Sequence, residues 1–179
     1  MNRTFGVLVV VVTALLAGTV HAQTVGWNYV EGGWGTVDPD GGSREDGWFL
    51  GGAVGLGKLP LHVYAEFGDF GPLDQWQIGF GWHGLLGKRA DLFADGAFFD
   101  ADIDDGFKIR FGVRWMLLKR LELNGNLAWT ELDFSDNQSA AVNAIFDFTK
   151  RFGVGGGIEG GSDVNSARVF ARFNFGSRE

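Results

Sequence analysis

Polar and apolar side chains alternate in short blocks along this chain, and the alternation limits the possible folds more than any other feature. In the segment KIRFGVRWM, residues 108–116, the cations Lys108, Arg110 and Arg114 alternate with apolar residues. Successive side chains of a β-strand point to opposite sides, so this pattern predicts a strand with one polar and one apolar face. No segment after residue 22 has the period of an amphipathic helix. We therefore expect an all-β fold.

Similar blocks follow one another with short breaks between them. We expect strands at about residues 27–37, 47–57, 61–69, 74–83, 90–99, 106–116, 121–131, 140–149, 152–161 and 166–175. Bacterial outer-membrane barrels cross the bilayer with even numbers of tilted strands, each of ~9–11 residues. The sequence predicts an antiparallel up-and-down transmembrane β-barrel of about ten strands, with eight strands as the alternative.

Composition agrees with a closed β-sheet and excludes several other classes of protein. Glycine makes up 30 of the 179 residues, against about 7% in average proteins, and aromatic residues make up 15%. Glycine and aromatic residues on short, evenly spaced strands are typical of barrels. The chain has no cysteine, which excludes a disulfide framework. Its net charge of −7 argues against nucleic acid as a partner.

The first 22 residues have the features of a secretory signal peptide. A basic residue, Arg3, precedes an apolar run at residues 5–18, and the small-x-small sequence VHA follows at residues 20–22. The apolar run is shorter than the ~20 residues of a transmembrane helix. We expect residues 1–22 to be removed on export and residues 23–179 to form a single outer-membrane barrel.

Charged residues on the polar face have opposite charges on neighbouring strands. Hairpin register predicts three such pairs, which are Asp95–Arg110, Asp91–Arg114 and Glu159–Arg168. A solvated face does not need paired charges, whereas a confined face does, because burying an unpaired charge is costly. We therefore predict that this face lines the lumen. The expected charge network consists of Glu31, Glu66, Asp91, Asp95, Lys108, Arg110, Arg114, Glu122, Asp147, Glu159, Arg168 and Arg172.

Aromatic residues of the apolar face gather near both ends of the strands. Amphipathic rings at the two interfaces of a bilayer form girdles around membrane barrels. The expected girdle residues are Trp34, Trp48, Trp76 and Trp129 at one end, joined there by Phe107, and Trp82, Trp115 and Phe175 at the other end. The alternative is a soluble secreted barrel or sandwich with its aromatic side chains inside.

The first expected strand alternates less clearly than the others. If Glu31 faces the lumen, Val30 and Trp34 face lipid, but Trp27 and Tyr29 then face inward with Glu31. A bulge in this strand or a plug at the periplasmic mouth would account for the pattern.

The connections between strands separate by charge and predict the orientation. The turns after even-numbered strands are short and basic, with Lys58, Lys88, Arg89, Lys119, Arg120, Lys150 and Arg151. The other connections are mostly longer and acidic, with Asp38, Asp40, Glu45, Asp46, Asp100, Asp102, Asp104, Asp105, Asp133, Asp136 and Asp163. Short turns of outer-membrane barrels face the periplasm and longer loops face outside. We expect the acidic end at the cell surface.

Four segments carry a resemblance to a known group. They are WNYVEGGWG at 27–35, DGWFLGGAVGLG at 46–57, LDQWQIGFGW at 73–82 and RVFARFNFG at 168–176. The mature chain resembles the small single-domain outer-membrane β-barrel proteins of Gram-negative bacteria, one branch of which is proposed to act in cell-cell signalling or biofilms. The resemblance implies an outer-membrane location and no catalytic residue. Phe173 and Phe175 resemble the C-terminal signal read by the barrel assembly machinery, although residues 176–179 follow the last aromatic.

Motifs that could carry chemistry are weak. GGGIEG at 155–160 matches a phosphate-binding pattern, but that motif requires a following helix, and here a strand follows. DADIDDG at 100–106 resembles a calcium loop without its Gly and Glu positions, so divalent-cation binding by the acidic loops stays open. Outside the signal peptide, the histidines are His62 and His83, both expected near periplasmic strand ends and away from the serines. We therefore expect neither an enzyme nor a cofactor or metal site.

Two function classes remain. The favoured interpretation is a structural or cell-surface interaction barrel whose lumen is plugged by the charge network, since the interior side chains of a slightly narrower eight-stranded barrel just fill it. The alternative is a narrow passive porin-like channel for small solutes. The expected partners are outer-membrane lipid, lipopolysaccharide and the barrel assembly machinery, and the expected state is a monomer.

Overall fold

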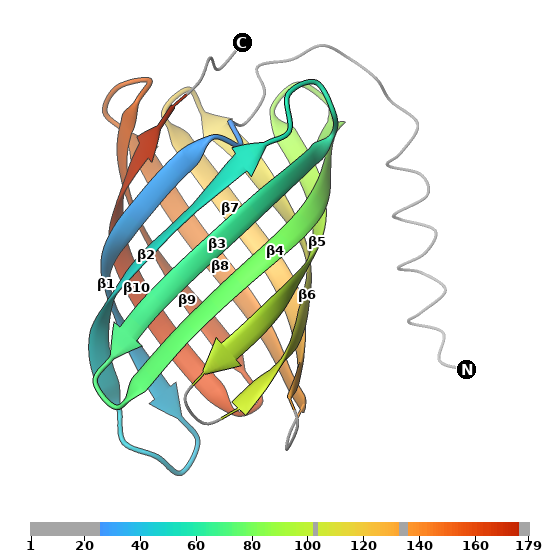
Figure 1. The fold of residues 1–179 in the computed structure, drawn as a ribbon. Coiled ribbons are helices and arrows are strands. Elements are labelled where there is room, and N and C mark those ends of the chain that lie inside the picture. The colour runs from blue at the N-terminus through green and yellow to red at the C-terminus, as the bar shows by residue number, and fades with distance from the viewer. Residues whose placement is uncertain (1–25, 102–103, 133–135, 176–179) are drawn as a thin grey trace.

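The computed structural model describes residues 26–101, 104–132 and 136–175. This part of the chain forms an antiparallel β-barrel of ten strands (Figure 1). The strands are β1 (Tyr29–Pro39), β2 (Glu45–Gly55), β3 (Leu61–Phe70), β4 (Leu73–Leu86), β5 (Ala90–Ala101), β6 (Asp104–Leu118), β7 (Leu121–Leu132), β8 (Asp136–Asp147), β9 (Phe152–Gly161) and β10 (Val164–Asn174). The predicted ten-strand up-and-down barrel is confirmed, and the eight-strand alternative is wrong.

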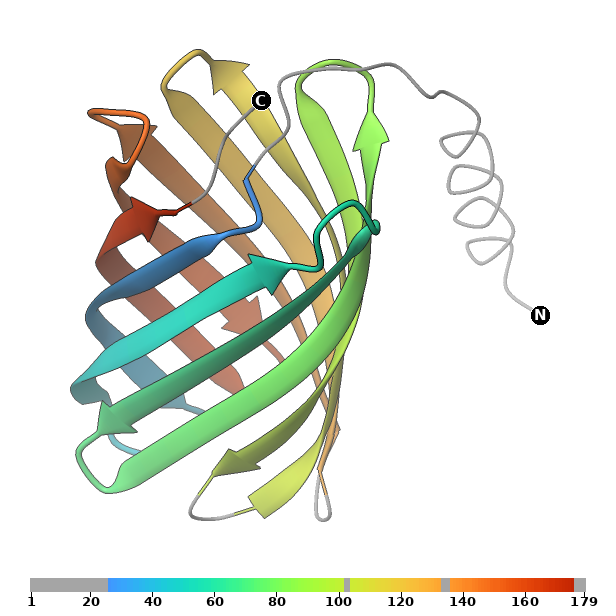
Figure 2. The ribbon, with the colours of Figure 1, turned by 45° about the horizontal axis from the view of Figure 1, so that its top comes forward.

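The barrel closes because its first and last strands pair along their length. β1 lies antiparallel to β10, with Val30 opposite Phe173 and Val37 opposite Ser166. Each strand therefore has a neighbour on both sides, and no row of backbone donors and acceptors is left at an open edge. Figure 2 shows the tilted strands around the axis, with the start of β1 and the end of β10 at the same end of the barrel.

Tight turns join several neighbouring strands, and glycine makes these turns possible. Gly41, Gly57, Gly71 and Gly87 have φ values of 77°, 67°, 72° and 72°. They lie between β1 and β2, β2 and β3, β3 and β4, and β4 and β5. A residue with a Cβ is strained at such φ values, whereas glycine is not. The turns fix which residues of each hairpin stand opposite one another.

The two faces of the strands differ sharply in chemistry. On β6, Ile109, Phe111 and Trp115 are exposed on the outside of the barrel, whereas Arg114 on the opposite face is only 1% exposed. The same division holds on β8, where Val142 and Phe146 are exposed and Asn143 and Ile145 are buried. The barrel therefore has an apolar outer surface and a largely polar interior, as the alternation predicts.

Glycines on the inner face leave space for large side chains of the neighbouring strand. A Cβ added to Gly79 would lie 2.4 Å from the ring of Tyr64, and one added to Gly112 would lie 2.4 Å from the ring of Phe93. Both contacts are far closer than van der Waals distance. The glycine content therefore reflects a crowded interior.

Strand β1 keeps a regular register with both neighbours. Of the two alternatives for this strand, the bulge is therefore wrong. A register shift occurs elsewhere, in the pairing of β6 with β7 between Met116 and Leu118. Among the described residues, no helix is long and apolar enough to cross a membrane. The predicted signal peptide, Asp102 of the acidic loop, Asp133 and the C-terminal residues 176–179 lie outside the described residues.

Candidate functional site in the barrel lumen

Two cavities lie in the lumen among the described residues, one toward each end of the barrel. The larger cavity, called here the outer chamber, has a volume of about 430 Å3 and is lined by residues such as Val37, Phe70, Gln75 and Val164 near the acidic connections. The smaller cavity, called the inner cavity, has a volume of about 60 Å3 and lies among Tyr29, Arg114 and other residues nearer the basic turns. The end that carries the acidic connections is called the acidic end, and the other end the basic end.

A buried group of charges occupies the basic half of the lumen. Arg114 Nε donates to Glu122 Oε1 at 2.8 Å, and Arg172 Nη1 lies 3.4 Å from the same oxygen. Arg172 Nη2 also lies 2.5 Å from Glu31 Oε2. The exposed fraction of these four side chains is between 0 and 6%. Each of these charges has a close partner of opposite sign, which matters because a lone buried charge would be strongly unfavourable.

A second group of charges lies next to the inner cavity. Arg110 donates two hydrogen bonds to Asp95, from Nε to Oδ1 at 2.8 Å and from Nη2 to Oδ2 at 3.2 Å. The Tyr64 hydroxyl donates to Asp95 Oδ1 at 3.2 Å, and the Arg110 guanidinium lies 4.3 Å from the Tyr64 ring centre. Asp95 stands opposite Arg110 in the β5–β6 hairpin, as predicted. Bidentate, charge-assisted pairs between arginine and a carboxylate include some of the strongest hydrogen bonds in proteins.

The residues just before β1 enter the lumen at its basic end. Trp27 is buried, and its ring stacks on His62 at 3.9 Å and on His83 at 4.9 Å between ring centres. Its Nε1 donates to Asp91 Oδ2 at 2.8 Å, and the Arg114 guanidinium lies 4.6 Å from its ring. The inward direction of Trp27 was predicted, but its stacking on the two histidines, whose own ring centres lie 5.7 Å apart, was not, because sequence alternation gives a face and no cross-lumen partner.

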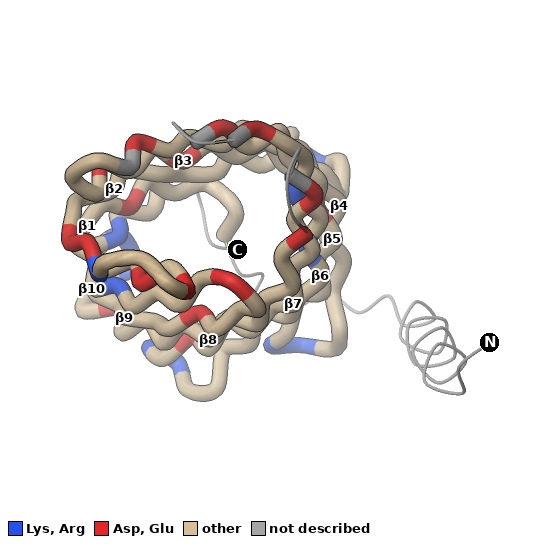
Figure 3. Tube along the Cα trace, turned by 90° about the horizontal axis from the view of Figure 1, so that it is seen from below, with Lys and Arg blue, Asp and Glu red and all other residues tan. Residues whose placement is uncertain are grey.

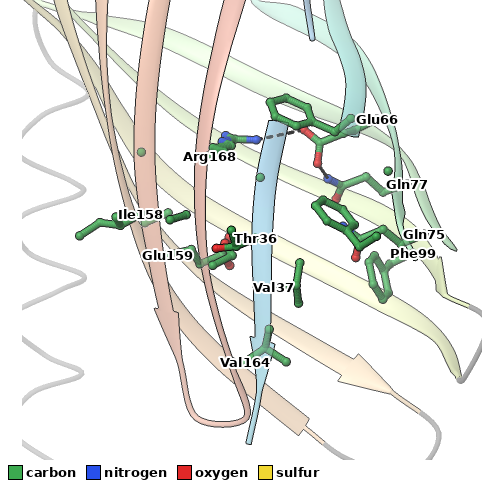
Figure 4. Close-up of a pocket in the computed structure, with 18 of the residues that line it drawn as sticks. Thr36, Val37, Glu66, Gln75, Gln77, Phe99, Ile158, Glu159, Val164 and Arg168 are labelled. Atoms are coloured by element: carbon green, nitrogen blue, oxygen red, sulfur yellow. Dashed lines mark hydrogen bonds and ion pairs between the residues drawn. The ribbon is translucent and has the colours of Figure 1, made fainter. Parts of the chain in front are cut away.

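A third, more open layer separates the two cavities. Arg168 Nη1 donates to Glu66 Oε2 at 3.2 Å and Nε donates to Asn143 Oδ1 at 3.1 Å. Gln77 Nε2 donates to Glu66 Oε1 at 3.1 Å. Figure 4 shows Arg168, Glu66 and Gln77 joined in this way, with Val37 and Val164 nearer the ends of the strands. Arg168 and Glu66 remain 32% and 25% exposed, so water reaches this layer.

The outer chamber also holds a loosely associated ion pair. Lys108 Nζ lies 3.8 Å from Glu159 Oε1, and the Ser139 hydroxyl donates to the same oxygen at 2.5 Å. At 3.8 Å the lysine is beyond the usual N–H···O range, so its ammonium attracts Glu159 without a normal hydrogen bond. The Glu159 side chain is 32% exposed, against 15% for the Lys108 side chain.

One of the three expected oppositions is wrong, and another is confirmed in register although its two side chains bind other partners. Arg168 does not face Glu159, because β9 and β10 are joined through only Ser162 and Asp163, and this tight turn places Glu159 opposite Ser166 and Arg168 opposite Gly157. Asp91 does stand opposite Arg114, but it binds Trp27, while Arg114 donates to Glu122. The last expected network member, Asp147, is buried on the inner face of β8 near the basic end.

The expected girdle residues lie on the outer face of the barrel. Trp34, Trp48, Trp76, Phe107 and Trp129 are between 41 and 62% exposed and lie toward the acidic end. Trp82, Trp115 and Phe175 are between 36 and 45% exposed and lie toward the basic end. Between these two sets the outer surface carries aliphatic and phenylalanine side chains such as Leu50, Ile78, Phe80, Phe111 and Val142.

Comparison with known proteins gives a clear likeness in fold. No protein-family model and no curated protein sequence matches this chain. Among solved structures, the KdgM porin is 8% identical, with a TM-score of 0.56 over 83% of this chain and 99% of the porin. The NanC porin is 9% identical, with a TM-score of 0.54 over 83% of this chain and all of the porin. At these identities the likeness concerns the fold, so the chain has the small porin-like β-barrel fold.

Proposed function

We propose that this protein is an outer-membrane β-barrel that provides a narrow passive channel for small solutes. The sequence alone favoured a structural or surface-interaction role and gave the channel as the alternative. The likeness in fold to the KdgM and NanC porins and the two cavities in the lumen favour the alternative.

The outer surface supports the placement in a membrane. Large apolar side chains are exposed on nine of the ten strands, including Leu50, Ile78, Phe111 and Val169, and β5 is the exception among the described residues. A soluble monomer rarely exposes apolar patches of more than a few hundred Å2, whereas a membrane barrel has an apolar band between two aromatic girdles. In the proposed topology the chain is exported by its N-terminal signal peptide, and the acidic end of the barrel faces the cell exterior.

The single observation that carries the channel proposal is that one thin layer divides the lumen. Glu66, Gln77, Asn143 and Arg168 line both the outer chamber and the inner cavity. Gln77 and Asn143 are buried, but Arg168 and Glu66 are partly exposed, and side chains in exposed positions change rotamer on a ps–ns timescale. Displacement of the Arg168 side chain from Glu66 would join the two cavities into a longer polar path.

The basic half of the lumen restricts this path. Trp27, Arg114 and Glu122 are buried there and held by short polar contacts. We therefore expect a small conductance compared with that of wide porins. The same buried contacts are the observation that favours the second candidate function, a closed barrel with a structural or surface-interaction role.

Planar-bilayer recording of the refolded protein separates the two candidates. The channel proposal predicts small steady currents from the unmutated protein and larger ones from Arg168→Ala, because that change removes the side chain between the two cavities. Lys119→Ala is the matched control, since this cation lies exposed on a turn outside the lumen, and its currents should equal those of the unmutated protein.

The opposite outcome is equally clear. Silent traces from the unmutated protein, with or without current in Arg168→Ala, would remove the channel proposal and leave the closed structural barrel. Each preparation is first checked for a heat-dependent shift on gels, so that a silent trace from unfolded protein is not counted.

A further inference from the structure

The acidic end of the barrel has a strong excess of negative charge. The described carboxylates there are Asp38, Asp40, Glu45, Asp46, Asp69, Asp74, Asp100, Asp105, Glu131, Asp136 and Asp163, and together they are called the acidic rim. Among the described residues of the strand ends and turns at this end, the one cation is Arg44, whose Nε lies 3.8 Å from Asp46 Oδ1. Figure 3, seen from this end, shows Asp and Glu positions around much of the opening.

A ring of one charge sign at the mouth of a low-dielectric cavity selects what enters. Asp and Glu rings favour cations at channel mouths, and charged clefts raise the local concentration of solutes of opposite charge. Each carboxylate acts over a Debye length of about 8–10 Å at moderate salt. The acidic rim surrounds the entrance to the outer chamber, so a solute that approaches the chamber passes through this negative potential.

The chamber behind the rim has an apolar wall. Val37, Phe70, Phe99 and Val164 line it near the mouth, and Phe49 lies deeper. An engineered apolar cavity of about 150 Å3 is large enough to bind benzene. The outer chamber, at about 430 Å3, therefore has room for a small substituted ring with its polar group.

One carboxylate in this chamber is suited to receive a cationic group. Glu159 is more exposed than its neighbour Lys108, and their 3.8 Å separation leaves the ion pair loose. The hydrogen bond from Ser139 holds the carboxylate in place. An incoming ammonium group can therefore form a short charge-assisted hydrogen bond at Glu159 without first breaking a strong one.

The other cation of the chamber is less open to an anionic solute. Arg168 already donates to Glu66 and Asn143, and its guanidinium lies 5.4 Å from the Phe49 ring centre and 5.5 Å from that of Phe170. An anion would have to cross the acidic rim and compete with Glu66 for Nη1 and with Asn143 for Nε.

We infer that the outer chamber binds small organic cations, namely primary amines with an apolar or aromatic body. The ammonium group lies at Glu159 and the apolar body lies against the side chains of Val37, Phe70 and Phe99. As the class of solute that the channel carries, this inference rests on the proposed function, but binding in the chamber does not require passage through the barrel.

Calorimetric titration of the refolded, unmutated protein in detergent tests the inference with three probes of one shape. Benzylammonium should bind saturably, whereas benzoate and benzyl alcohol should bind at least about tenfold more weakly, the loss expected for one charge-assisted hydrogen bond. Glu159→Gln should weaken benzylammonium binding by a similar factor, while Glu159→Asp, which keeps the charge, should retain most of it. Raising the salt concentration should weaken binding of benzylammonium, because salt screens the acidic rim.

The results separate the two proposals. Equal binding of benzoate or benzyl alcohol, or unchanged benzylammonium binding in a folded Glu159→Gln variant, would overturn the inference. Selective benzylammonium binding to a protein that carries no current would retain the amine site and remove the channel. Current without selective binding would retain the channel and remove the amine site.

Discussion

Replacement of Arg114 by alanine should destabilise the barrel strongly. Arg114 is 1% exposed, its Nε donates to the fully buried Glu122, and its Nη1 donates to the Gly26 carbonyl at 3.2 Å. Removing one partner of a buried ion pair typically costs about 3–5 kcal/mol. Arg172 still lies 3.4 Å from Glu122 in the variant, so we expect the lower end of this range, about 3 kcal/mol.

The assay is urea unfolding of the refolded protein in lipid vesicles, followed by tryptophan fluorescence. Four further variants serve as controls, namely Lys119→Ala, the single variants Arg114→Met and Glu122→Gln, and the double variant that combines these two. Lys119→Ala, on an exposed turn, should change the free energy of unfolding by no more than about 0.5 kcal/mol. The double variant Arg114→Met/Glu122→Gln removes both buried charges together. Its loss in free energy of unfolding should therefore be about 1–3 kcal/mol smaller than the summed losses of Arg114→Met and Glu122→Gln.

Two results would contradict this account. If Arg114→Ala lowers the free energy of unfolding by less than about 1 kcal/mol, the buried Glu122 does not depend on Arg114 to compensate its charge. Strict additivity in the double variant would mean that Arg114 and Glu122 act independently, in spite of their 2.8 Å contact.

Four further outcomes follow from the barrel. The folded protein should stay in the membrane fraction after osmotic shock and should migrate differently on gels with and without boiling; release with periplasmic proteins would contradict the membrane placement. An epitope inserted at Gly42 should be labelled on intact cells and one inserted at Lys119 should not, and the reverse pattern would invert the proposed topology. Gly79→Ala should lower stability by about 1–3 kcal/mol in the urea assay, since its Cβ would lie 2.4 Å from the ring of Tyr64, whereas Gly96→Ala, whose Cβ would lie 4.0 Å from the Lys108 carbonyl oxygen, should be nearly neutral. Trp27→Ala should raise the bilayer current, because its ring fills the basic end of the lumen, and an unchanged current would place the restriction elsewhere.

Local patterns in the sequence were enough to predict the strands and their faces. Alternation along residues 108–116 identified Ile109 and Trp115 as outward and Arg110 and Arg114 as inward, because the side-chain period of a strand is fixed by its backbone. The opposition of Asp95 and Arg110 was also predictable, since both lie on one hairpin.

The sequence alone could not predict which side chains meet across the lumen. Arg168 meets Glu66, a residue 102 positions away on β3 rather than on a neighbouring strand. Which inner side chains meet across a barrel depends on strand tilt and stagger, which are properties of the closed sheet and not of any one hairpin. The error in the β9–β10 register had a smaller cause, a turn shorter than expected at Ser162 and Asp163.

The pairing of β1 with β10 has a consequence for how the chain can fold. Glu31 and Arg172 meet at this seam, although 141 positions separate them in the sequence. Contacts between such distant residues form late and slowly, because a long stretch of chain must be ordered first. Until the last strand arrives, a partial sheet has unpaired backbone at both edges and an inner carboxylate without its arginine, and neither is tolerated in hydrocarbon. Assembly of this barrel is therefore all-or-none, and the seam ion pair forms only in the finished molecule.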